Sequence, residues 1–557
     1  MGSRSGGPLI VQGDMTVLLE VDNPRYEEAR DALACFAELV KSPEHIHTYR
    51  ITPLSVWNAR AGGIPLERMV GSLSELSRFP VPDHVLDGIR ELASRYGRLR
   101  LEAAEGGLAL RADSPELAGL IAEYDSVRGL LGRRMRAGFS VDPGLRGELK
   151  RALVDIGYPA EDLAGYTDGE GLEMSLRETA LSGGRFRIRD YQREAVDAFH
   201  AAGGPRGGSG VVVQPCGAGK TIVGIGCMER LQTSTLVLAT NTTALRQWRD
   251  ELLDKTTLTA DQIGEYSGAR KEIRPVTLAT YHIMTYSRGE GEYPHLRLFG
   301  ERDWGLIVYD EVHLLPAPVF RMTADLQARR RLGLTATLVR EDGREGDVFA
   351  LIGPRKAAVP WKELERQGWI AKAVCTEIRL PMSRELTLRH AAAHARARNR
   401  IAAENPAKLP VVRSLVERHR GERILIMGMY VDQVRSMGRE LGVPVITGRT
   451  PQRKRERLFE EFRRGETPVL SVSKVANFSV DLPDASVAIQ VSGTFGSRQE
   501  EAQRLGRILR PKPGENSAHF YSLVSRDSRE QEFALKRQLY LCEQGYEYAI
   551  EYADEAV

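Results

Sequence analysis

The stretch Val211–Thr221 constrains this chain more than any other. It reads V-V-V-Q-P-C-G-A-G-K-T, and an apolar run follows it from Ile222. An apolar strand that turns through glycines into a helix is typical of a phosphate-binding loop, because backbone N–H groups and the positive end of the helix dipole face the phosphate. In this pattern the lysine reaches the terminal phosphates and the threonine hydroxyl ligates Mg²⁺. The sequence therefore predicts a site for ATP and Mg²⁺ at Gly217, Ala218, Gly219, Lys220 and Thr221.

The loop departs from the general pattern at its first position. The form G-x-x-x-x-G-K-[ST] begins with glycine, whereas this chain has Gln214. The tighter form x-x-G-x-G-K-T is typical of superfamily-two helicases and translocases, so the departure narrows the class. Upstream, the run R-F-R-I-R-D-Y-Q sets Gln192 at a helix start, where its amide could read an adenine edge. We group Arg189 of the same run with the ATP-binding residues.

A second stretch, W-G-L-I-V-Y-D-E-V-H, places Asp310 and Glu311 at the end of an apolar strand. Phosphoryl transfer requires such a pair, because an aspartate holds Mg²⁺ on the phosphates and an adjacent carboxylate orients and deprotonates the attacking water. A lone D-E is also common as a solvated acidic turn. Its position ninety residues after Lys220, at a strand end, favours the catalytic role. Thr221 and Asp310 are thus the predicted metal ligands.

Residues 185–360 read as alternating strands and helices, which predicts a parallel sheet. Residues 370–557 show the same alternation but contain no phosphate-binding loop. This suggests a partner domain that completes the first site from across a cleft. In Q-R-L-G-R-I-L-R, Arg507 and Arg510 lie three residues apart on one face of a helix end, where they could stabilise charge on the γ-phosphate. Surface arginines at this spacing are frequent, so the spacing alone leaves both interpretations open.

Composition narrows the function less than the motifs do. The chain has 557 residues, enough for three or four domains, and a net charge of only +3. This charge neither requires nor excludes nucleic acid, so any DNA-binding surface must come from local clustering. The five cysteines form no C-x-x-C pair, and His45 and His47 have no neighbouring ligand set, so we expect no zinc site. No apolar run approaches the ~18 residues of a membrane span, and we expect a soluble, cytoplasmic protein without membrane contact.

Two basic segments are candidates for contact with nucleic acid. Arg384–Arg400 has one acid among many bases, which favours phosphate contact over an ordinary solvated helix. Arg133, Arg134 and Arg136 precede Phe139. That grouping suits phosphate contact with base stacking or wedging, and it suits a solvated loop equally well.

Polar residues that directly follow buried strands are further candidates, because open α/β sheets bind ligands at that edge. Thr242 follows the strand Leu236–Thr240, and Tyr281 follows the strand Val276–Thr280. We expect the helix after Thr242 to expose three further side chains, those of Arg246, Gln247 and Trp248.

Several motifs together resemble a known family. In chain order, G-A-G-K-T, D-E-V-H, T-A-T and Q-R-L-G-R-I-L-R are similar to the motif set of superfamily-two helicases. The runs T-A-T-L-V-R-E-D, G-W-I-A-K, S-K-V with D-L-P, and E-A-Q-R-L-G-R resemble XPB-type DNA repair helicases. P-L-I-V near the start and E-H-I-H-T-Y near residue 45 extend the likeness over nearly the whole chain. The long acidic inserts of eukaryotic relatives are missing, so the bacterial branch is the closest match.

The resemblance implies an α/β chain with two RecA-like parallel-sheet helicase domains, preceded by smaller α+β domains. It implies a DNA-dependent ATPase with 3′→5′ polarity in DNA repair of the nucleotide excision type, acting at the bacterial nucleoid. The predicted domains are an N-terminal domain, a domain similar to damage-recognition domains, helicase domain 1, and helicase domain 2 with a thumb-like insert near 381–408. Their ranges are 1–100, 101–175, 176–365 and 366–557.

The resemblance also assigns roles to individual residues. Strand separation falls to Arg340, Glu341 and Asp342. The arginine fingers are Arg507 and Arg510, with Gln503 facing the nucleotide. Coupling between domain closure and hydrolysis is assigned to His313, Thr335, Thr337 and Asp481. The DNA-facing arginines of the thumb-like insert are Arg396, Arg398 and Arg400.

The chain departs from the family in one stretch. Relatives commonly carry S-K-V-G-D-T-S-F-D where this chain has S-K-V-A-N-F-S-V-D, so the resemblance does not extend to Ala476, Asn477 and Phe478 in the segment that links DNA contact to ATP. The implied partners are single-stranded DNA and forked or damaged duplexes, with a nuclease or other repair protein as known for some relatives. Alternative functions are a double-stranded DNA translocase that remodels promoters or protein–DNA complexes, an ATP-gated DNA-binding module, and an RNA helicase.

Overall fold

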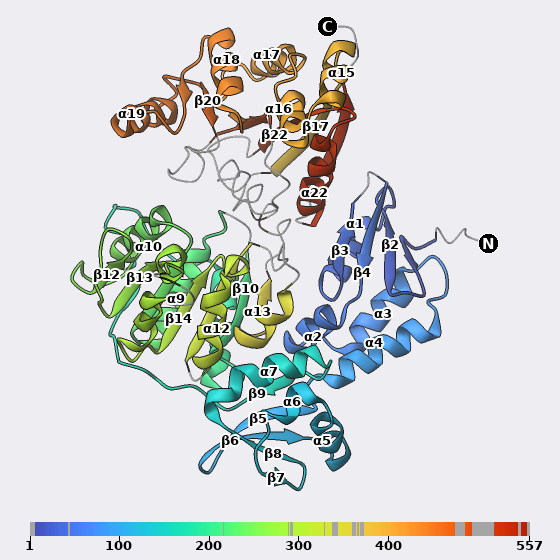
Figure 1. The fold of residues 1–557 in the computed structure, drawn as a ribbon, viewed down its shortest axis with the longest axis vertical. Coiled ribbons are helices and arrows are strands. Elements are labelled where there is room, and N and C mark those ends of the chain that lie inside the picture. Colours follow the sequence, from blue (N-terminus) through green and yellow to red (C-terminus); the bar gives the residue numbers. More distant parts are fainter. Residues whose placement is uncertain are drawn as a thin grey trace. The chain divides into compact units, whose positions relative to one another are not determined.

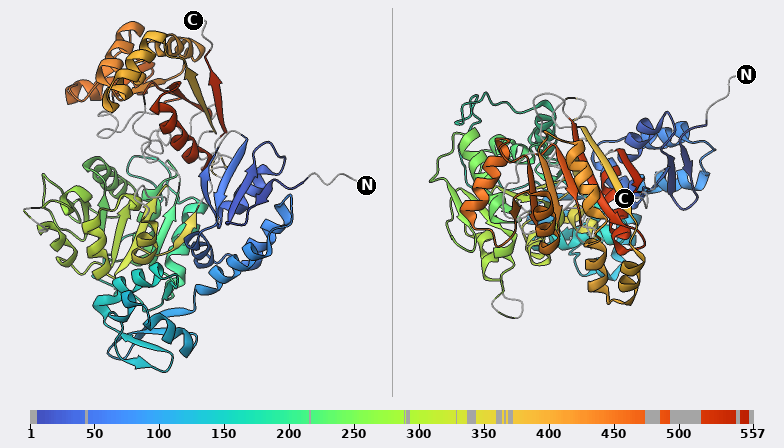
Figure 2. Two further views of the ribbon diagram at one scale, coloured as in Figure 1. Left: turned by 45° about the vertical axis from the view of Figure 1, so that its right-hand side comes forward. Right: turned by 90° about the horizontal axis from the view of Figure 1, so that it is seen from above.

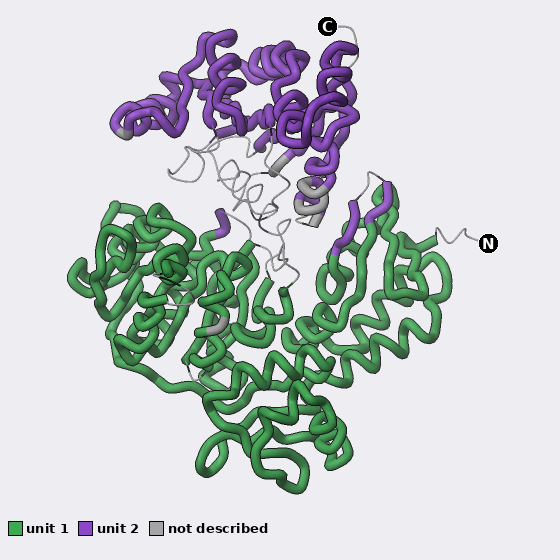
Figure 3. Tube along the Cα trace, in the orientation of Figure 1, with its two compact units in different colours: residues 1–38, 48–214, 219–359 green, residues 39–47, 215–218, 360–557 purple. Residues whose placement is uncertain are grey.

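The computed structural model describes residues 6–42, 45–214, 217–287, 289, 293–327, 329–336, 344–358, 364, 367, 372–473, 485–492, 517–543 and 547–553. The chain divides into two compact units (Figure 3). Unit 1 comprises residues 1–38, 48–214 and 219–359, and unit 2 comprises residues 39–47, 215–218 and 360–557. Among the described residues, no helix is long and apolar enough to cross a membrane.

A four-stranded sheet with the order β1-β2-β4-β3 opens the chain, and helices α3 and α4 lie beside it (blue in Figure 2). Strands β1 and β2 are antiparallel, with Leu9 opposite Leu19. Thr52 begins α2 with a capping box, in which its hydroxyl accepts the Ser55 N–H. The bounds are β1 Leu9–Val11, β2 Thr16–Glu20, α1 Tyr26–Ala34, β3 Glu38–Lys41, β4 Ile46–Arg50, α2 Pro53–Ala61, α3 Leu66–Leu76 and α4 Asp83–Arg95.

A five-stranded sheet follows, with the order β7-β8-β6-β5-β9. Phe139 lies in β8 and is buried, with only 6% of its surface exposed, so the structure corrects the idea that this side chain stacks on a base. Arg133, Arg134 and Arg136 remain exposed on the hairpin. The bounds are β5 Leu99–Ala104, β6 Gly107–Ala112, α5 Pro115–Ala122, α6 Asp125–Arg128, β7 Arg134–Met135, β8 Gly138–Val141, η1 Pro143–Leu145, α7 Arg146–Asp155 and β9 Ala160–Asp162.

A buried ionic cluster joins this second sheet to the next domain. Asp162, at the end of β9, accepts from Arg146 at 2.7 Å and from Lys150 at 2.9 Å. Lys150 also donates to Gln327 at 2.9 Å, and Gln327 belongs to the next domain. Burial lowers the pKa of Lys150 to about 8 although Asp162 opposes this shift. Because a buried charge without a partner is costly, the three charges depend on one another.

The segment 167–184 packs against the following domain. Leu172 and Met174 are buried in that domain's core. The backbone N–H of Leu172 donates to the carbonyl of Gln232 at 2.9 Å. The segment therefore fixes one edge of the domain and does not act as a free tether.

A seven-stranded sheet forms the largest part of unit 1, with the order β12-β13-β11-β14-β15-β10-β16 (Figure 1). All its paired strands are parallel, as the alternation of strands and helices predicts. The bounds are α8 Asp190–His200, η2 Ala201–Gly203, β10 Ser209–Val213, α9 Lys220–Leu231, β11 Thr235–Ala239, α10 Thr242–Lys255, β12 Ile263–Tyr266, β13 Val276–Thr280, α11 Tyr281–Met284, η3 Pro294–Gly300, β14 Leu306–Asp310, η4 Val312–Leu314, α12 Ala317–Asp325, β15 Arg330–Thr335, α13 Glu345–Leu351 and β16 Arg355–Ala358.

Both faces of this sheet are covered, which explains why its strands read as continuous apolar runs. Val212, Val237 and Val308 pack against helices α8, α9 and α10 on one face. The alternate residues Leu236 and Ile307 pack against α11, α12 and α13 on the other face. The central strands therefore hold the residues that follow their carboxyl ends in fixed positions.

Unit 2 contains a second seven-stranded parallel sheet, with the order β19-β20-β18-β21-β22-β17-β23. The prediction of two parallel sheets in one chain is therefore confirmed. The bounds are β17 Lys372–Leu380, α15 Arg384–Ala392, α16 Ala395–Ala403, α17 Lys408–Arg418, β18 Ile424–Gly428, α18 Val431–Leu441, β19 Val445–Ile446, α19 Gln452–Arg463, β20 Val469–Ser473, β21 Val487–Gln490, β22 Ser517–Ser525, α22 Arg529–Glu543 and β23 Glu547–Tyr552.

The ionic cluster predicts a large stability effect at one carboxylate. Asp162→Asn should lower the free energy of unfolding by ~3–5 kcal/mol, because it leaves Arg146 and Lys150 buried without a counter-charge. The matched control is Asp113→Asn, which removes the partner of Arg98 in an exposed ion pair of the same sheet and should cost no more than ~1 kcal/mol. Urea unfolding of both variants measures the difference, and equal losses would contradict this account.

Candidate nucleotide-binding and DNA-contacting sites

The predicted ATP-site residues of unit 1 meet at one edge of the first sheet. Because the strands are parallel, the carboxyl ends of β10, β14 and β15 lie at the same edge. Asp310 ends β14, Thr335 ends β15, and Gln214 follows β10. The backbone N–H of Gln214 donates to the carbonyl of Thr335 at 2.9 Å, so the neighbouring strand ends are joined directly.

The loop after β10 has the backbone that a phosphate-binding turn requires. Gly217 and Gly219 have φ values of 83° and 79°, in the left-handed region that favours glycine. A Cβ at position 219 would lie 2.5 Å from Nε2 of Gln192. Gln192 therefore lies directly beside the loop, and its Oε1 accepts the backbone N–H of Arg189 at 3.0 Å. Both residues predicted upstream of the loop are thus part of its surroundings.

Lys220 and Glu311 form an ion pair at the centre of this edge. Nζ of Lys220 lies 2.9 Å from Oε1 of Glu311, and both side chains are largely buried. Oε2 of Glu311 lies 3.6 Å from Nδ1 of His313, and the same nitrogen lies 2.7 Å from the hydroxyl of Thr335. The lysine, the carboxylate, the histidine and the threonine therefore form one polar chain from the start of α9, past the end of β14, to the end of β15.

The pKa values of the two adjacent carboxyl groups, Asp310 and Glu311, are shifted in opposite directions. Burial and the neighbouring charge of Glu311 raise the pKa of Asp310 to about 6. Burial would also raise the pKa of Glu311, but the charges of Lys220 and His313 outweigh it and lower that pKa. Carboxyl pairs with separated pKa values are typical of sites that divide roles between two acids.

Two aromatic donors hold Asp310, and the sequence interpretation missed both. The indole N–H of Trp248 donates to Oδ2 of Asp310 at 3.0 Å. The hydroxyl of Tyr281 donates to the backbone carbonyl of Asp310 at 3.0 Å. Trp248 was expected to be exposed, but only 1% of its surface is exposed. The available signal was the apolar stripe Leu245, Trp248 and Leu252, which has helical spacing and packs into the core.

Burial also changes the interpretation of Tyr281 as a DNA contact. Only 5% of its surface is exposed, so its side chain packs inside the domain and is not presented to DNA. Thr242, the first residue of α10, is exposed, as are Arg246 and Gln247. The side chain of Asn241 caps this helix by accepting the Ala244 N–H at 3.0 Å. The exposed first turn of α10 remains available for a ligand.

The residues present fit ATP with Mg²⁺. Thr221 supplies a hydroxyl and Asp310 a carboxylate, the hard oxygen ligands that Mg²⁺ prefers. Gly219 leaves room for the side chain of Gln192 beside the loop, since it has no Cβ. Gln214 is fully buried, and within the described part of the chain neither polar atom of its side-chain amide has a hydrogen-bond partner, which leaves a polar group that a ligand can satisfy.

Other predicted residues lie outside the described part of the chain. These are the strand-separation residues, one threonine of T-A-T, the aspartate and the altered segment of the S-K-V motif, and the glutamine and both arginine fingers. By number they are Arg340, Glu341, Asp342, Thr337, Asp481, Ala476–Phe478, Gln503, Arg507 and Arg510.

The basic segment predicted as one helix forms two, α15 and α16, which join at Ala393 and His394. Arg398 caps the end of α15, because its guanidinium donates to the carbonyls of Ala391 and Ala393 at 2.8 and 2.7 Å. Arg400 pairs with Glu404 at 2.9 Å and with Asp432 at 2.7 Å. Among the described residues, Arg396 has no such partner and is exposed, as are Arg384 and Arg389.

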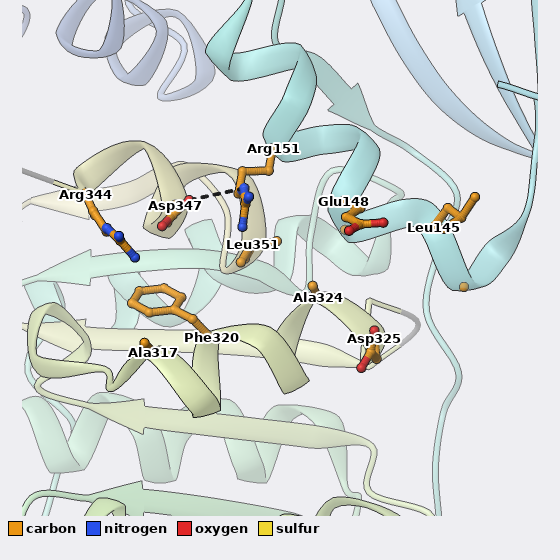
Figure 4. Close-up of a pocket in the computed structure, with 12 residues that line it drawn as sticks. Leu145, Glu148, Arg151, Ala317, Phe320, Ala324, Asp325, Arg344, Asp347 and Leu351 are labelled. Carbon is orange, nitrogen blue, oxygen red and sulfur yellow. Dashed lines mark ion pairs between the residues drawn. The ribbon is translucent and has the colours of Figure 1, made fainter. Parts of the chain in front are cut away.

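A separate cavity of 420 Å³ lies between α7 and the helices α12 and α13 (Figure 4). Basic and acidic side chains mix along its wall, and Arg151 lies 3.8 Å from Asp347. This mixture gives no single sign of charge that would attract a phosphate. The lining residues are Gly144, Leu145, Gly147, Glu148, Arg151, Ala317, Phe320, Ala324, Asp325, Arg344, Asp347 and Leu351, and none of them is a predicted site residue.

A phosphate-binding loop, a carboxylate pair at the same sheet edge, and a second parallel sheet define a nucleotide-dependent motor of the helicase class. Comparison with family models agrees with this class. The model described as ERCC3/RAD25/XPB C-terminal helicase matches residues 364–555, and the model described as type III restriction enzyme, res subunit, matches residues 185–340. A model described as helicase conserved C-terminal domain matches residues 9–136, in the N-terminal part of this chain.

Whole-length relatives give the family. A protein of Kineococcus radiotolerans named DNA 3'-5' helicase XPB is 56% identical over 99% of this chain and 97% of its own length. A protein of the same name from Mycobacterium tuberculosis is 54% identical over 99% of this chain and 98% of its own length. In Antonospora locustae, a general transcription and DNA repair factor IIH helicase/translocase subunit XPB is 35% identical over 97% of this chain and 81% of its own length. The chain belongs to the XPB family of ATP-dependent DNA helicases.

The exposed arginines of α15 and α16 lead to a prediction for DNA binding. Replacing Arg384, Arg389 and Arg396 with alanine should weaken affinity for single-stranded DNA and reduce the slope of log affinity against log salt by ~2, because each phosphate contact releases about 0.7 counterion. The control replaces Arg420, Arg457 and Arg463, which are also exposed in unit 2. Fluorescence anisotropy across a salt series measures both slopes. If the two triple variants have the same slope, α15 and α16 are ordinary solvated helices.

Proposed function

We propose that this chain is an ATP-dependent DNA helicase that moves with 3′→5′ polarity in DNA repair of the nucleotide excision type. The observation that carries the proposal is the ion pair between Lys220 and Glu311, with Asp310 beside it, at the carboxyl edge of the first sheet. The names of the relatives from Kineococcus radiotolerans and Mycobacterium tuberculosis support the polarity. The name of the relative from Antonospora locustae supports the role in repair.

The residues of unit 1 divide the work of hydrolysis. Bound ATP with Mg²⁺ would supply the activated phosphoryl group. Thr221 and Asp310 would hold the cation, and Lys220 would exchange Glu311 for phosphate oxygens. Glu311, once released by Lys220, would orient and deprotonate the attacking water. Gln192 and Arg189 would contact the adenine. His313 would transmit a movement of Glu311 to Thr335, because its ring contacts both residues.

The family motifs support the remaining roles. Arg507 and Arg510 act as arginine fingers, with Gln503 facing the nucleotide. Thr337 and Asp481 couple closure to hydrolysis, and Arg340, Glu341 and Asp342 separate the strands. We further propose the domain ranges 1–100, 101–175, 176–365 and 366–557, with α15 and α16 as the thumb-like insert near 381–408.

DNA is the partner on which the chain acts, and forked or damaged duplexes are the proposed substrates. A nuclease or another repair protein is a further proposed partner, supported by the resemblance to relatives that have one. The proposed location is the cytoplasm, at the nucleoid, where this substrate lies.

A second candidate function is translocation on double-stranded DNA without net unwinding, which would remodel protein–DNA or promoter complexes. The name helicase/translocase of the Antonospora locustae relative favours it. The two candidates share the ATP site and differ in whether hydrolysis is accompanied by strand separation.

Strand displacement on tailed duplexes separates these functions. We expect DNA to stimulate hydrolysis more than RNA does, and displacement from 3′-tailed but not from 5′-tailed duplexes. Lys220→Ala should abolish both activities, because it removes the cation that binds the terminal phosphates. The control Lys255→Ala removes a half-buried lysine that pairs with Glu251 at the end of α10, and it should leave both activities unchanged. Displacement from 5′ tails alone would contradict the polarity, and duplex-stimulated hydrolysis without displacement would favour the translocase.

A further inference from the structure

Helix α10 presses a buried tryptophan against the ATP-site carboxylate. The indole of Trp248 donates to Oδ2 of Asp310 at 3.0 Å, and the ring is almost wholly buried. A hydrogen bond to a carboxylate in such surroundings is stronger than one in water and fixes the rotation of the carboxyl group. The orientation of the proposed Mg²⁺ ligand therefore depends on where α10 holds the indole.

The indole also lies against the helix that carries Lys220 and Thr221. Gly224, one turn further along α9, makes room for it, since a Cβ there would lie 2.4 Å from Cη2 of Trp248. The ring is therefore wedged between the helix that follows the phosphate-binding loop and the strand that ends in Asp310. A shift of α10 cannot leave both of these neighbours where they are, because close-packed interiors transmit displacement.

The opposite face of α10 is exposed and polar. Thr242, Arg246 and Gln247 lie there, on the first two turns and next to the buried Trp248 in sequence. One rigid helix thus carries the proposed DNA-contacting surface on one side and the donor to Asp310 on the other. Tyr281, which follows the neighbouring strand β13, holds the backbone carbonyl of the same aspartate at 3.0 Å.

We propose that Trp248 is a positioning residue that sets the carboxylate of Asp310 for Mg²⁺ according to the position of α10. Through it, contact between DNA and the exposed face of α10 changes the geometry of the cation site. The proposal rests on the proposed ATPase function. The buried indole would orient the carboxylate as well as fill space in the core. These two roles lead to different predictions for variants of Trp248.

Trp248→Phe tests this role, because it keeps an aromatic ring and removes the N–H donor. The matched control is Trp304→Phe. Trp304 is fully buried in the same domain, and its N–H donates to the carbonyl of Leu298 at 2.9 Å. Both variants lose one buried hydrogen bond, but only Trp248 contacts the carboxylate. Equilibrium binding of a fluorescent ADP with and without Mg²⁺ gives a measurement that does not depend on turnover.

Wild-type protein and Trp304→Phe should bind ADP more tightly in Mg²⁺, by the same factor. In Trp248→Phe that factor should fall ~10-fold, the usual effect of losing a group that orients a metal ligand. Affinity for ADP without Mg²⁺ should stay unchanged in this variant. The stimulation of kcat by DNA should fall together with the Mg²⁺ factor. A second variant, Gly224→Ala, displaces the indole without removing its N–H and should give the same loss.

The outcomes separate the proposal from the function on which it rests. If wild-type protein shows no DNA-stimulated hydrolysis, the proposed function fails. If wild-type protein shows it and Trp248→Phe keeps both the Mg²⁺ factor and the stimulation, the positioning role is wrong. Equal losses in Trp248→Phe and Trp304→Phe would overturn it as well, because they would reflect packing alone.

Discussion

The ion pair between Lys220 and Glu311 is the interaction on which the rest of this site depends. It joins the first residue of the helix after β10 to the residue that follows β14, and strand β15 lies between those two strands. Thr335, at the end of β15, contacts His313, which in turn faces Glu311. Two largely buried charges at this edge would be costly apart, so they stabilise each other until a phosphate takes the lysine. Under the proposed function, binding of a nucleotide and release of Glu311 from Lys220 are therefore one event.

The sequence predicted this edge well because each part has a local signature. Gly219 and Lys220 are read from spacing, and Asp310 and Glu311 from an apolar strand that ends in two acids. The two parallel sheets could be predicted as well, because alternating apolar strands and helices are also a local pattern in the sequence. Contacts between distant segments have no such signature. The bond from Trp248 to Asp310 joins residues 62 positions apart, and it requires the packing of α10 to be known.

Contacts made within the folded chain explain the other differences between sequence and structure. Phe139 beside three arginines suits base stacking in sequence, but its hairpin turns the ring inward. Arg398 reads as a basic side chain for phosphate, yet it caps a neighbouring helix. In each case composition was read correctly, and tertiary contacts decided what the side chain does.

ATP binding and single-turnover hydrolysis in Glu311→Gln test whether Glu311 acts in hydrolysis and holds Lys220 beforehand. The ATP affinity of this variant should at least equal that of wild-type protein, because a neutral amide competes less for Lys220. Its hydrolysis should be slower by about 10²–10⁴-fold, the usual contribution of a general base. Hydrolysis at the wild-type rate, or loss of ATP binding, would show that Glu311 does not have this role.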